Sequence, residues 1–196
     1  MYFDGTFRYI GAIDPAPLAR AVESFGEAAW LEHVGRQHSY NMHRGTQSIP
    51  LLYDDDGRHT QPTPWPRLAQ LEPLLEPALT IIRKANPPVP GTDDEGYFIR
   101  IILTRLNPHC WIYRHRDGGD TLLRSHRNHI AITTDQRIEF EVGDDIRHLA
   151  PGEIWEINNR EEHAVRNPTD NGRVHLIVDY VVPGEIIEDP EERCVA

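Results

Sequence analysis

The chain has 196 residues, a length that suits one domain with a substantial hydrophobic core. Hydrophobic residues make up 39% of it and charged residues 26%, as in ordinary soluble globular proteins. The formal net charge of −11 argues against binding to a nucleic-acid backbone or to an anionic membrane surface. We therefore expect neither a nucleic-acid partner nor a membrane partner.

Cysteine usage and the apolar runs predict a soluble, cytoplasmic protein. The two cysteines, Cys110 and Cys194, are too few for a disulfide framework or a zinc ribbon. The first twenty residues lack an apolar core of signal-peptide length, and the longest apolar runs are far too short to span a bilayer. The sequence leaves the oligomeric state open.

The N-terminal region begins with a predicted helix over residues 14–37, where apolar residues recur near helical spacing. Asp14 is a plausible N-cap, and Gly26 is a potential break that would divide the segment into two helices. Residues 38–53 are predicted to be extended.

A second helix is predicted over residues 64–85, which carry a stripe of leucines and isoleucines. Pro73 and Pro77 are expected to kink this helix or to delay its start. Residues 85–96 are rich in proline and glycine and are predicted to be a linker.

The chain after residue 96 consists of eight short β-rich runs, most of them separated by turn signals such as Asn-Pro and Pro-Gly pairs. The runs span residues 97–106, 110–117, 126–134, 137–142, 146–150, 153–158, 163–167 and 173–182. Strands this short and this regularly spaced predict a mostly β fold, a jelly roll or barrel, with the N-terminal helices packed on one sheet. The acidic tail over residues 183–196 lies outside this pattern.

The stretch "IYRHRDGGD", residues 112–120, ends a strand-like run on His115 and Asp117. Residues two apart on a strand point to the same face, so these side chains can converge on one point. His163, at the start of a later run, is the best third ligand in the sequence. Two histidines and one carboxylate suit non-haem Fe(II), whereas other combinations would suit zinc. The alternative is a polar loop without a metal.

Arg173 opens the apolar run at residues 173–182 and shares one face of it with His175, Ile177 and Asp179. Because this strand is apolar on both faces, we expect it to be covered on both, and a buried guanidinium then needs an anionic partner. That partner is either Asp179 or a dicarboxylate cosubstrate reaching in from a metal. Spacing leaves both possibilities open.

The motifs "RIILTRLNPHCWIYRHRD", "HRNHIAITT" and "PGEIWEINNREEHAVRNPTDNGRVHLIVDY" together resemble the catalytic core of the aspartyl/asparaginyl β-hydroxylase-like family. The resemblance covers about residues 97–182 and extends to the bacterial proline cis-hydroxylases. It implies a dioxygenase that uses Fe(II), 2-oxoglutarate and O2 on a double-stranded β-helix, a cupin-like jelly roll. It also implies a single dioxygenase domain over residues 1–196, with an N-terminal segment (1–96), a β-helix core (97–182) and a tail (183–196).

The resemblance also assigns roles to seven residues. The catalytic metal ligands it implies are His115, Asp117 and His163. The residues implied to bind the far carboxylate of 2-oxoglutarate are Arg173 and Thr104, and those at its iron-side end are Arg127 and His129. The presence of a carboxylate ligand favours hydroxylation.

The substrate implied by the resemblance is an amino acid or short peptide, whose C–H bond is hydroxylated with release of succinate and CO2. We expect its pocket to include four polar residues: His43, Arg44, Gln47 and Arg124. Two alternatives remain: a cupin-like metalloenzyme that does not use 2-oxoglutarate, and a non-catalytic binding module on the same fold.

Overall fold

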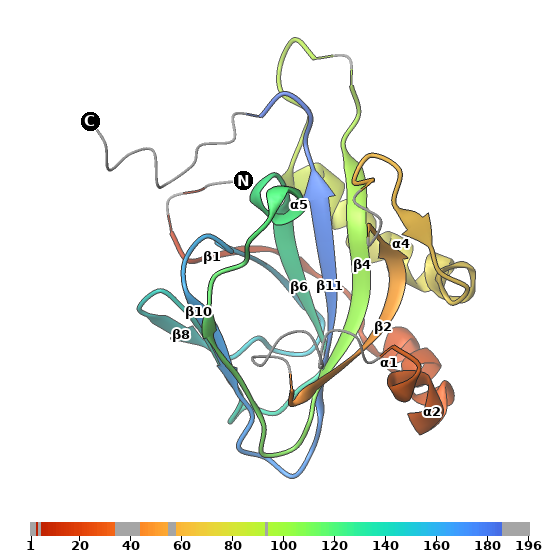
Figure 1. The fold of residues 1–196 in the computed structure, drawn as a ribbon, viewed down its shortest axis with the longest axis vertical. Helices are drawn as coiled ribbons and strands as arrows, with labels where there is room; N and C mark the ends of the chain where they lie inside the picture. The colour runs from red at the N-terminus through yellow and green to blue at the C-terminus, as the bar shows by residue number, and fades with distance from the viewer. Residues whose placement is uncertain (1–2, 4, 34–43, 55–57, 93, 186–196) are drawn as a thin grey trace.

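The computed structural model describes residues 3, 5–33, 44–54, 58–92 and 94–185. Two antiparallel β-sheets lie face to face, and helices cover the outer face of the larger sheet (Figure 1). This architecture confirms the predicted mostly β, jelly-roll fold class with N-terminal helices on one sheet.

The larger sheet has the strand order β1-β9-β6-β11-β4-β2-β3, and the smaller sheet has the order β5-β10-β7-β8. The strands of the larger sheet are β1 (Phe7–Ala12), β9 (Glu153–Ile157), β6 (His126–Thr133), β11 (Arg173–Val181), β4 (Tyr97–Leu106), β2 (Thr46–Tyr53) and β3 (Thr63–Pro64). Those of the smaller sheet are β5 (Trp111–His115), β10 (His163–Arg166), β7 (Glu139–Val142) and β8 (Asp145–Arg147).

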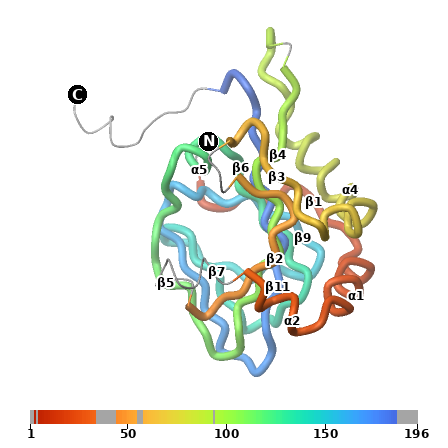
Figure 2. Tube along the Cα trace, turned by 45° about the vertical axis from the view of Figure 1, so that its right-hand side comes forward, coloured from red at the N-terminus to blue at the C-terminus, as the bar shows by residue number. Residues whose placement is uncertain are grey.

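Each of the eight predicted β-rich runs forms a strand, within a few residues of its predicted ends. The N-terminal region adds three strands to the larger sheet, of which β2 lies in the segment predicted to be extended. The short runs β1 and β3 were not predicted. β1 lies beside β9 and β2 beside β4, strands that come from later in the chain (Figure 2).

The helices agree with the sequence prediction except that the two prolines of the second helix do not delay its start. Helices α1 (Ala16–Ser24) and α2 (Gly26–Leu31) are separated at Gly26, whose φ of +68° favours glycine, as expected. The predicted second helix is α4 (Leu68–Ala85), and it continues past both internal prolines, which therefore do not delay its start. A one-turn helix, α5 (Asp120–Leu123), follows the His-x-Asp motif. No helix in the described ranges is long and apolar enough to cross a membrane.

The side chains of the larger sheet divide between two hydrophobic cores. Arg173, Ile177 and Asp179 of β11 line the inner cavities, whereas Leu176, Val178 and Tyr180 belong to the core shared with α1 and α4 on the other side. The core between the sheets contains apolar residues from both, including Leu106 of β4, Phe140 of β7 and others. Polar residues at one end of this inner core form the candidate site.

Candidate metal and cosubstrate site

The three predicted metal ligands come together at one end of the smaller sheet. His115 ends β5 and His163 begins β10, and the two lie directly opposite each other in this antiparallel pair. Asp117 follows two residues after His115, in the loop that leads to α5. Strand pairing thus supplies the long-range contact that sequence spacing alone could not establish.

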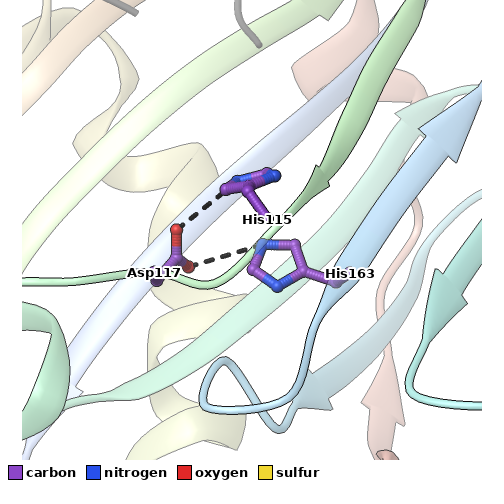
Figure 3. Close-up of side chains that lie close together, drawn as sticks. All are labelled: His115, Asp117 and His163. Atoms are coloured by element: carbon purple, nitrogen blue, oxygen red, sulfur yellow. Dashed lines mark ion pairs between the residues drawn. The ribbon is translucent and has the colours of Figure 1, made fainter.

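The geometry of the three ligand atoms fits a single metal ion. They all lie within 4.8 Å of one another, with Asp117 oxygens 3.7 Å from Nε2 of His115 and 3.6 Å from Nε2 of His163 (Figure 3). With metal–ligand bonds of about 2.1 Å, two ligands of one ion lie roughly 3–4 Å apart. Two imidazoles and one carboxylate on one side of an ion leave open positions and suit non-haem Fe(II).

Both histidines are held with Nε2 toward this common point. Nδ1 of His115 lies 2.7 Å from the carbonyl oxygen of Tyr113, and Nδ1 of His163 lies 3.1 Å from that of Glu161. A proton on Nδ1 that is donated to a carbonyl leaves Nε2 unprotonated and free to bind a metal. Burial lowers the pKa of His163, against the opposing effect of Asp117, and so favours the neutral ligand form.

Asp117 is held from two sides. Its backbone N–H donates to the carbonyl oxygen of Asn159, and its Oδ2 accepts a hydrogen bond from Arg127 at 2.6 Å. Arg127 in turn donates from Nε and one terminal nitrogen to the two oxygens of Asp179, at 2.9 and 2.8 Å. Burial alone would lower the pKa of Arg127, but the Asp117 and Asp179 carboxylates outweigh it and raise this pKa.

Arg173 lacks such partners. It is 3% exposed, and no ion pair to it occurs among the described residues, because Asp179 is taken by Arg127. Its Nε has no hydrogen-bond partner, one terminal nitrogen lies 2.7 Å from Nδ1 of His175, and its guanidinium lies over the ring of Phe140. Burial lowers its pKa to about 9.

His175 acts as a neutral support for this guanidinium. Burial is the largest cause that lowers the pKa of His175 well below its usual value, and the charge of the neighbouring Arg173 lowers it further. The neutral imidazole can therefore accept a hydrogen bond from Arg173 at Nδ1. Thr104 lies across the strand pair from His175 and faces the same side of the sheet.

A single pocket connects the metal ligands to Arg173. Its walls combine the three ligands and the four residues implied to bind the cosubstrate with a few mostly apolar residues. The lining residues are Thr46, Thr104, Ile112, His115, Asp117, Arg127, His129, Phe140, His163, Val165, Arg173 and Ile177. The structure therefore brings together all seven residues that the sequence motifs singled out.

Comparison with known protein families decides the classification. A family model described as "Aspartyl/Asparaginyl beta-hydroxylase" matches residues 83–183, just over half of the chain. The chain belongs to the aspartyl/asparaginyl β-hydroxylase family. This confirms the resemblance seen in the sequence, and with it the predicted class of enzyme, a hydroxylase.

Solved structures share the fold of this aspartyl/asparaginyl β-hydroxylase family member. A 2OG-Fe(II) oxygenase-family oxidoreductase from Burkholderia pseudomallei is 17% identical, with a TM-score of 0.62 over 90% of this chain and 84% of that one. A Trichoplax adhaerens prolyl hydroxylase, solved with a peptide fragment of hypoxia inducible factor, is 13% identical, with a TM-score of 0.59 over 98% and 88%.

A third similar structure is HygX from Streptomyces hygroscopicus, solved with nickel, 2-oxoglutarate and hygromycin B. It is 13% identical, with a TM-score of 0.59 over 95% of this chain and 87% of that one. At such identities the likeness establishes the fold. A search of curated protein sequences finds no significant match.

The three described residues of the four expected in the substrate pocket are not among those that line the metal pocket. His43 lies outside the described residues. Arg44 is exposed, and Arg124, which follows α5, donates to Asp120 of that helix. Gln47 lies on the helix-covered face, where it accepts hydrogen bonds from Arg105, so we correct its predicted place in the pocket.

The structure gives three further residues of the site roles that the sequence did not assign to them. Asp179 was weighed as a partner of Arg173 but binds Arg127, Asn159 holds Asp117 through its carbonyl oxygen, and Phe140 lies beneath Arg173. The alternation along β11 did place Asp179 on the inner face. Its partner depended on the pairing of β11 with β6, which places Asp179 opposite Arg127.

Proposed function

We propose that His115, Asp117 and His163 bind Fe(II), and that Arg173, with Thr104, binds the far carboxylate of 2-oxoglutarate. The observation that carries the proposal is the buried guanidinium of Arg173, which has no carboxylate partner among the described residues and lines the pocket that also holds the three ligand atoms. A buried charge without a carboxylate partner is costly, and a dicarboxylate that reaches from the metal would supply one.

The residues of the pocket prepare the reaction by orientation and by exclusion of water. When bound, Fe(II) and 2-oxoglutarate supply the activation of O2, with release of succinate and CO2. The two histidines present Nε2, and Arg127 orients Asp117 through its Oδ2. Phe140, Val165 and other apolar side chains keep the pocket dry, which strengthens the contact between Arg173 and a carboxylate. We keep Arg127 and His129 as candidate contacts of the iron-side end of the cosubstrate.

The substrate we propose is an amino acid or a short peptide. Among proteins of this fold, a prolyl hydroxylase was solved with a peptide fragment and HygX with hygromycin B, so the fold accommodates both peptides and small molecules. We propose a cytoplasmic location, since the two cysteines give no sign of a disulfide framework.

The two alternatives account for the site less well. A metalloenzyme without 2-oxoglutarate has no use for a second buried cation at the far end of the pocket, and a binding module has no use for an oriented ligand triad. Arg173 and the paired Nδ1 contacts therefore favour the oxygenase.

The test is iron-dependent release of succinate from 2-oxoglutarate in air. The wild-type protein should release succinate only with Fe(II), and His115→Ala should abolish both iron binding and release. His109→Ala is a matched control, because His109 is an exposed histidine that pairs with Asp170 on the surface. Release by His115→Ala at the wild-type rate would contradict the proposed function.

A further inference from the structure

A second small cavity adjoins the metal pocket on the side away from Arg173. The two cavities share Arg127 and Ile177, and the second is completed by four more residues. These are Tyr53, Arg100, Ile102 and Asp179. Four of its six lining residues are polar, and Arg127, which it shares with the metal pocket, donates a hydrogen bond to the metal ligand Asp117. The proposed function requires a substrate near the metal.

The strand register places this cavity at the opposite end of β11 from Arg173, which is proposed to bind the cosubstrate. Asp179 of β11 lies directly across from Arg100 of β4 on one side and from Arg127 of β6 on the other. Arg173 lies six residues earlier on β11, which is about 20 Å along a strand. Because Ile177 lies between these ends and lines both cavities, the pocket runs along β11 with a cation near each end.

The hydrogen bonds in this second cavity leave donors but few acceptors. Both oxygens of Asp179 accept from Arg127, and the two oxygens of Asp54 accept from Arg100 Nε and, at 2.5 Å, from Thr121. The carboxylates around the cavity are therefore already engaged.

Arg100 provides the available donors. Its guanidinium carbon lies 4.7 Å from the ring centroid of Tyr53, and its Nε is bound to Asp54. Its two terminal nitrogens make no hydrogen bond within the part of the chain that the structure describes. The stacking and the Asp54 contact fix the orientation of the fork, and the two terminal nitrogens of a fixed guanidinium match the two oxygens of a carboxylate.

We propose that Arg100 is a specificity-determining residue that binds a carboxylate of the substrate, and that Asp54 and Tyr53 hold it in position. The inference rests on the proposed function and narrows its substrate class to molecules or residues that carry a carboxylate group. Among the described residues, the carboxylate oxygens of Asp54 and Asp179 already accept hydrogen bonds from Arg100, Thr121 and Arg127, which favours an anionic group over an amine. Thr121 lies in α5, which follows the loop after Asp117. Its hydrogen bond to Asp54 therefore joins this part of the chain to the same subsite.

The test uses the protein loaded with redox-inert Zn(II) and saturating 2-oxoglutarate, and isothermal titration with two matched pairs of probes. The pairs are N-acetyl-L-aspartate with N-acetyl-L-asparaginamide, and N-acetyl-L-proline with N-acetyl-L-prolinamide, so that each amide carries no carboxylate. We expect at least one acid to bind about tenfold more tightly than its amide, because charge-assisted bidentate hydrogen bonds are the stronger kind. Equal binding of acids and amides, or no binding of either acid, would overturn the proposal.

Variants separate recognition from folding. Arg100→Met should lose the preference for the acid, and so should the double variant Arg100→Gln with Asp54→Asn, which replaces the buried ion pair by two amides. Arg105→Met is the matched control, because Arg105 lies on the same strand but bonds Glu27 and Gln47 on the opposite face. Retention of the acid preference in both Arg100 variants would refute the assignment.

Binding of Zn(II) and of 2-oxoglutarate, measured first in every preparation, separates this inference from the proposed function. If the wild-type protein bound neither Zn(II) nor 2-oxoglutarate, that result would count against the proposed function itself. Normal binding of both, with no role for Arg100 in acid recognition, would count against the subsite alone.

Discussion

Two buried arginines of the site differ in their surroundings, and the difference explains their roles. Arg127 is held by two carboxylates, which raise its pKa, whereas Arg173 has no carboxylate partner among the described residues and burial lowers its pKa to about 9. A fully paired guanidinium orients its neighbours, and an unpaired one is ready to bind an anion. Sequence motifs identified both arginines, but only the three-dimensional pairing distinguishes these roles.

Arg173→Met should stabilise the metal-free, cosubstrate-free protein. Replacement of buried charged groups by apolar residues of similar volume is often stabilising, by about 1–4 kcal/mol. Urea unfolding should show this gain without 2-oxoglutarate, while 2-oxoglutarate added to the metal-loaded proteins should stabilise the wild type much more than the variant. Destabilisation of the variant under the first condition would mean that Arg173 has a structural partner.

Asp179→Asn should weaken metal binding although Asp179 is not itself a ligand. The amide cannot hold Arg127 as a carboxylate does, so the orientation of Asp117 is lost, and such supporting contacts are typically worth about 10–100-fold in metal affinity. Equilibrium titration with Zn(II) measures the effect, and Asp179→Glu should recover part of it. Unchanged affinity in the asparagine variant would show that Arg127 holds Asp117 without help.

At the scale of elements, the site is assembled from strand ends and the loops that follow them. The pairing of β5 with β10 brings His115 and His163 together, and the turn at Asn158 and Asn159 fixes the loop that carries Asp117. The eight strands after residue 96 could be predicted because apolar runs and turn residues alternate there. β1 could not, because its six residues are mostly half-buried and show no clear alternation.

The contacts of His126 with two glutamates make the free energy of unfolding depend on pH. His126 of β6 lies 2.6 Å from Glu156 of β9 and 2.9 Å from Glu185, which follows β11. Burial acts to lower the pKa of His126, but the two glutamates outweigh it and raise this pKa. Its stabilising contribution is therefore complete below its unfolded pKa of about 6.5 and is lost as pH rises through the folded value.

The His126→Gln variant should lose the most unfolding free energy relative to the wild type at acidic pH, and the difference should shrink as pH rises above about 6.5. Denaturant unfolding across this range measures it, with the surface variant His109→Gln as control. A difference that stays constant or grows with pH would contradict the assigned ion pairs.

At the scale of the whole molecule, one sheet separates two cores with different tasks. The outer core joins the sheet to α1, α2 and α4, and the inner core carries the site at one end. The fold class and the ligand triad could be predicted from the sequence, since both rest on local patterns and motifs. The position of Gln47 and the Arg100 cavity could not, because they depend on strand register between distant segments.

Leu75→Ala, in the fully buried face of α4, tests this separation. Removal of a buried leucine side chain should cost about 2–5 kcal/mol of unfolding free energy. At a temperature where the variant is folded, Zn(II) affinity should equal that of the wild type. A parallel loss of metal affinity would show that the two cores are coupled.

The central claim is that one pocket holds the metal at its triad and the cosubstrate at Arg173. Its most direct test is anaerobic titration of the Fe(II)-loaded protein with 2-oxoglutarate, in the wild type and in Arg173→Met. We expect one equivalent of each per wild-type chain, and normal iron content in the variant. The variant should bind 2-oxoglutarate more weakly by about 2–5 kcal/mol, the usual cost of breaking a buried charge pair. Equal affinity for 2-oxoglutarate in the two proteins would contradict the account.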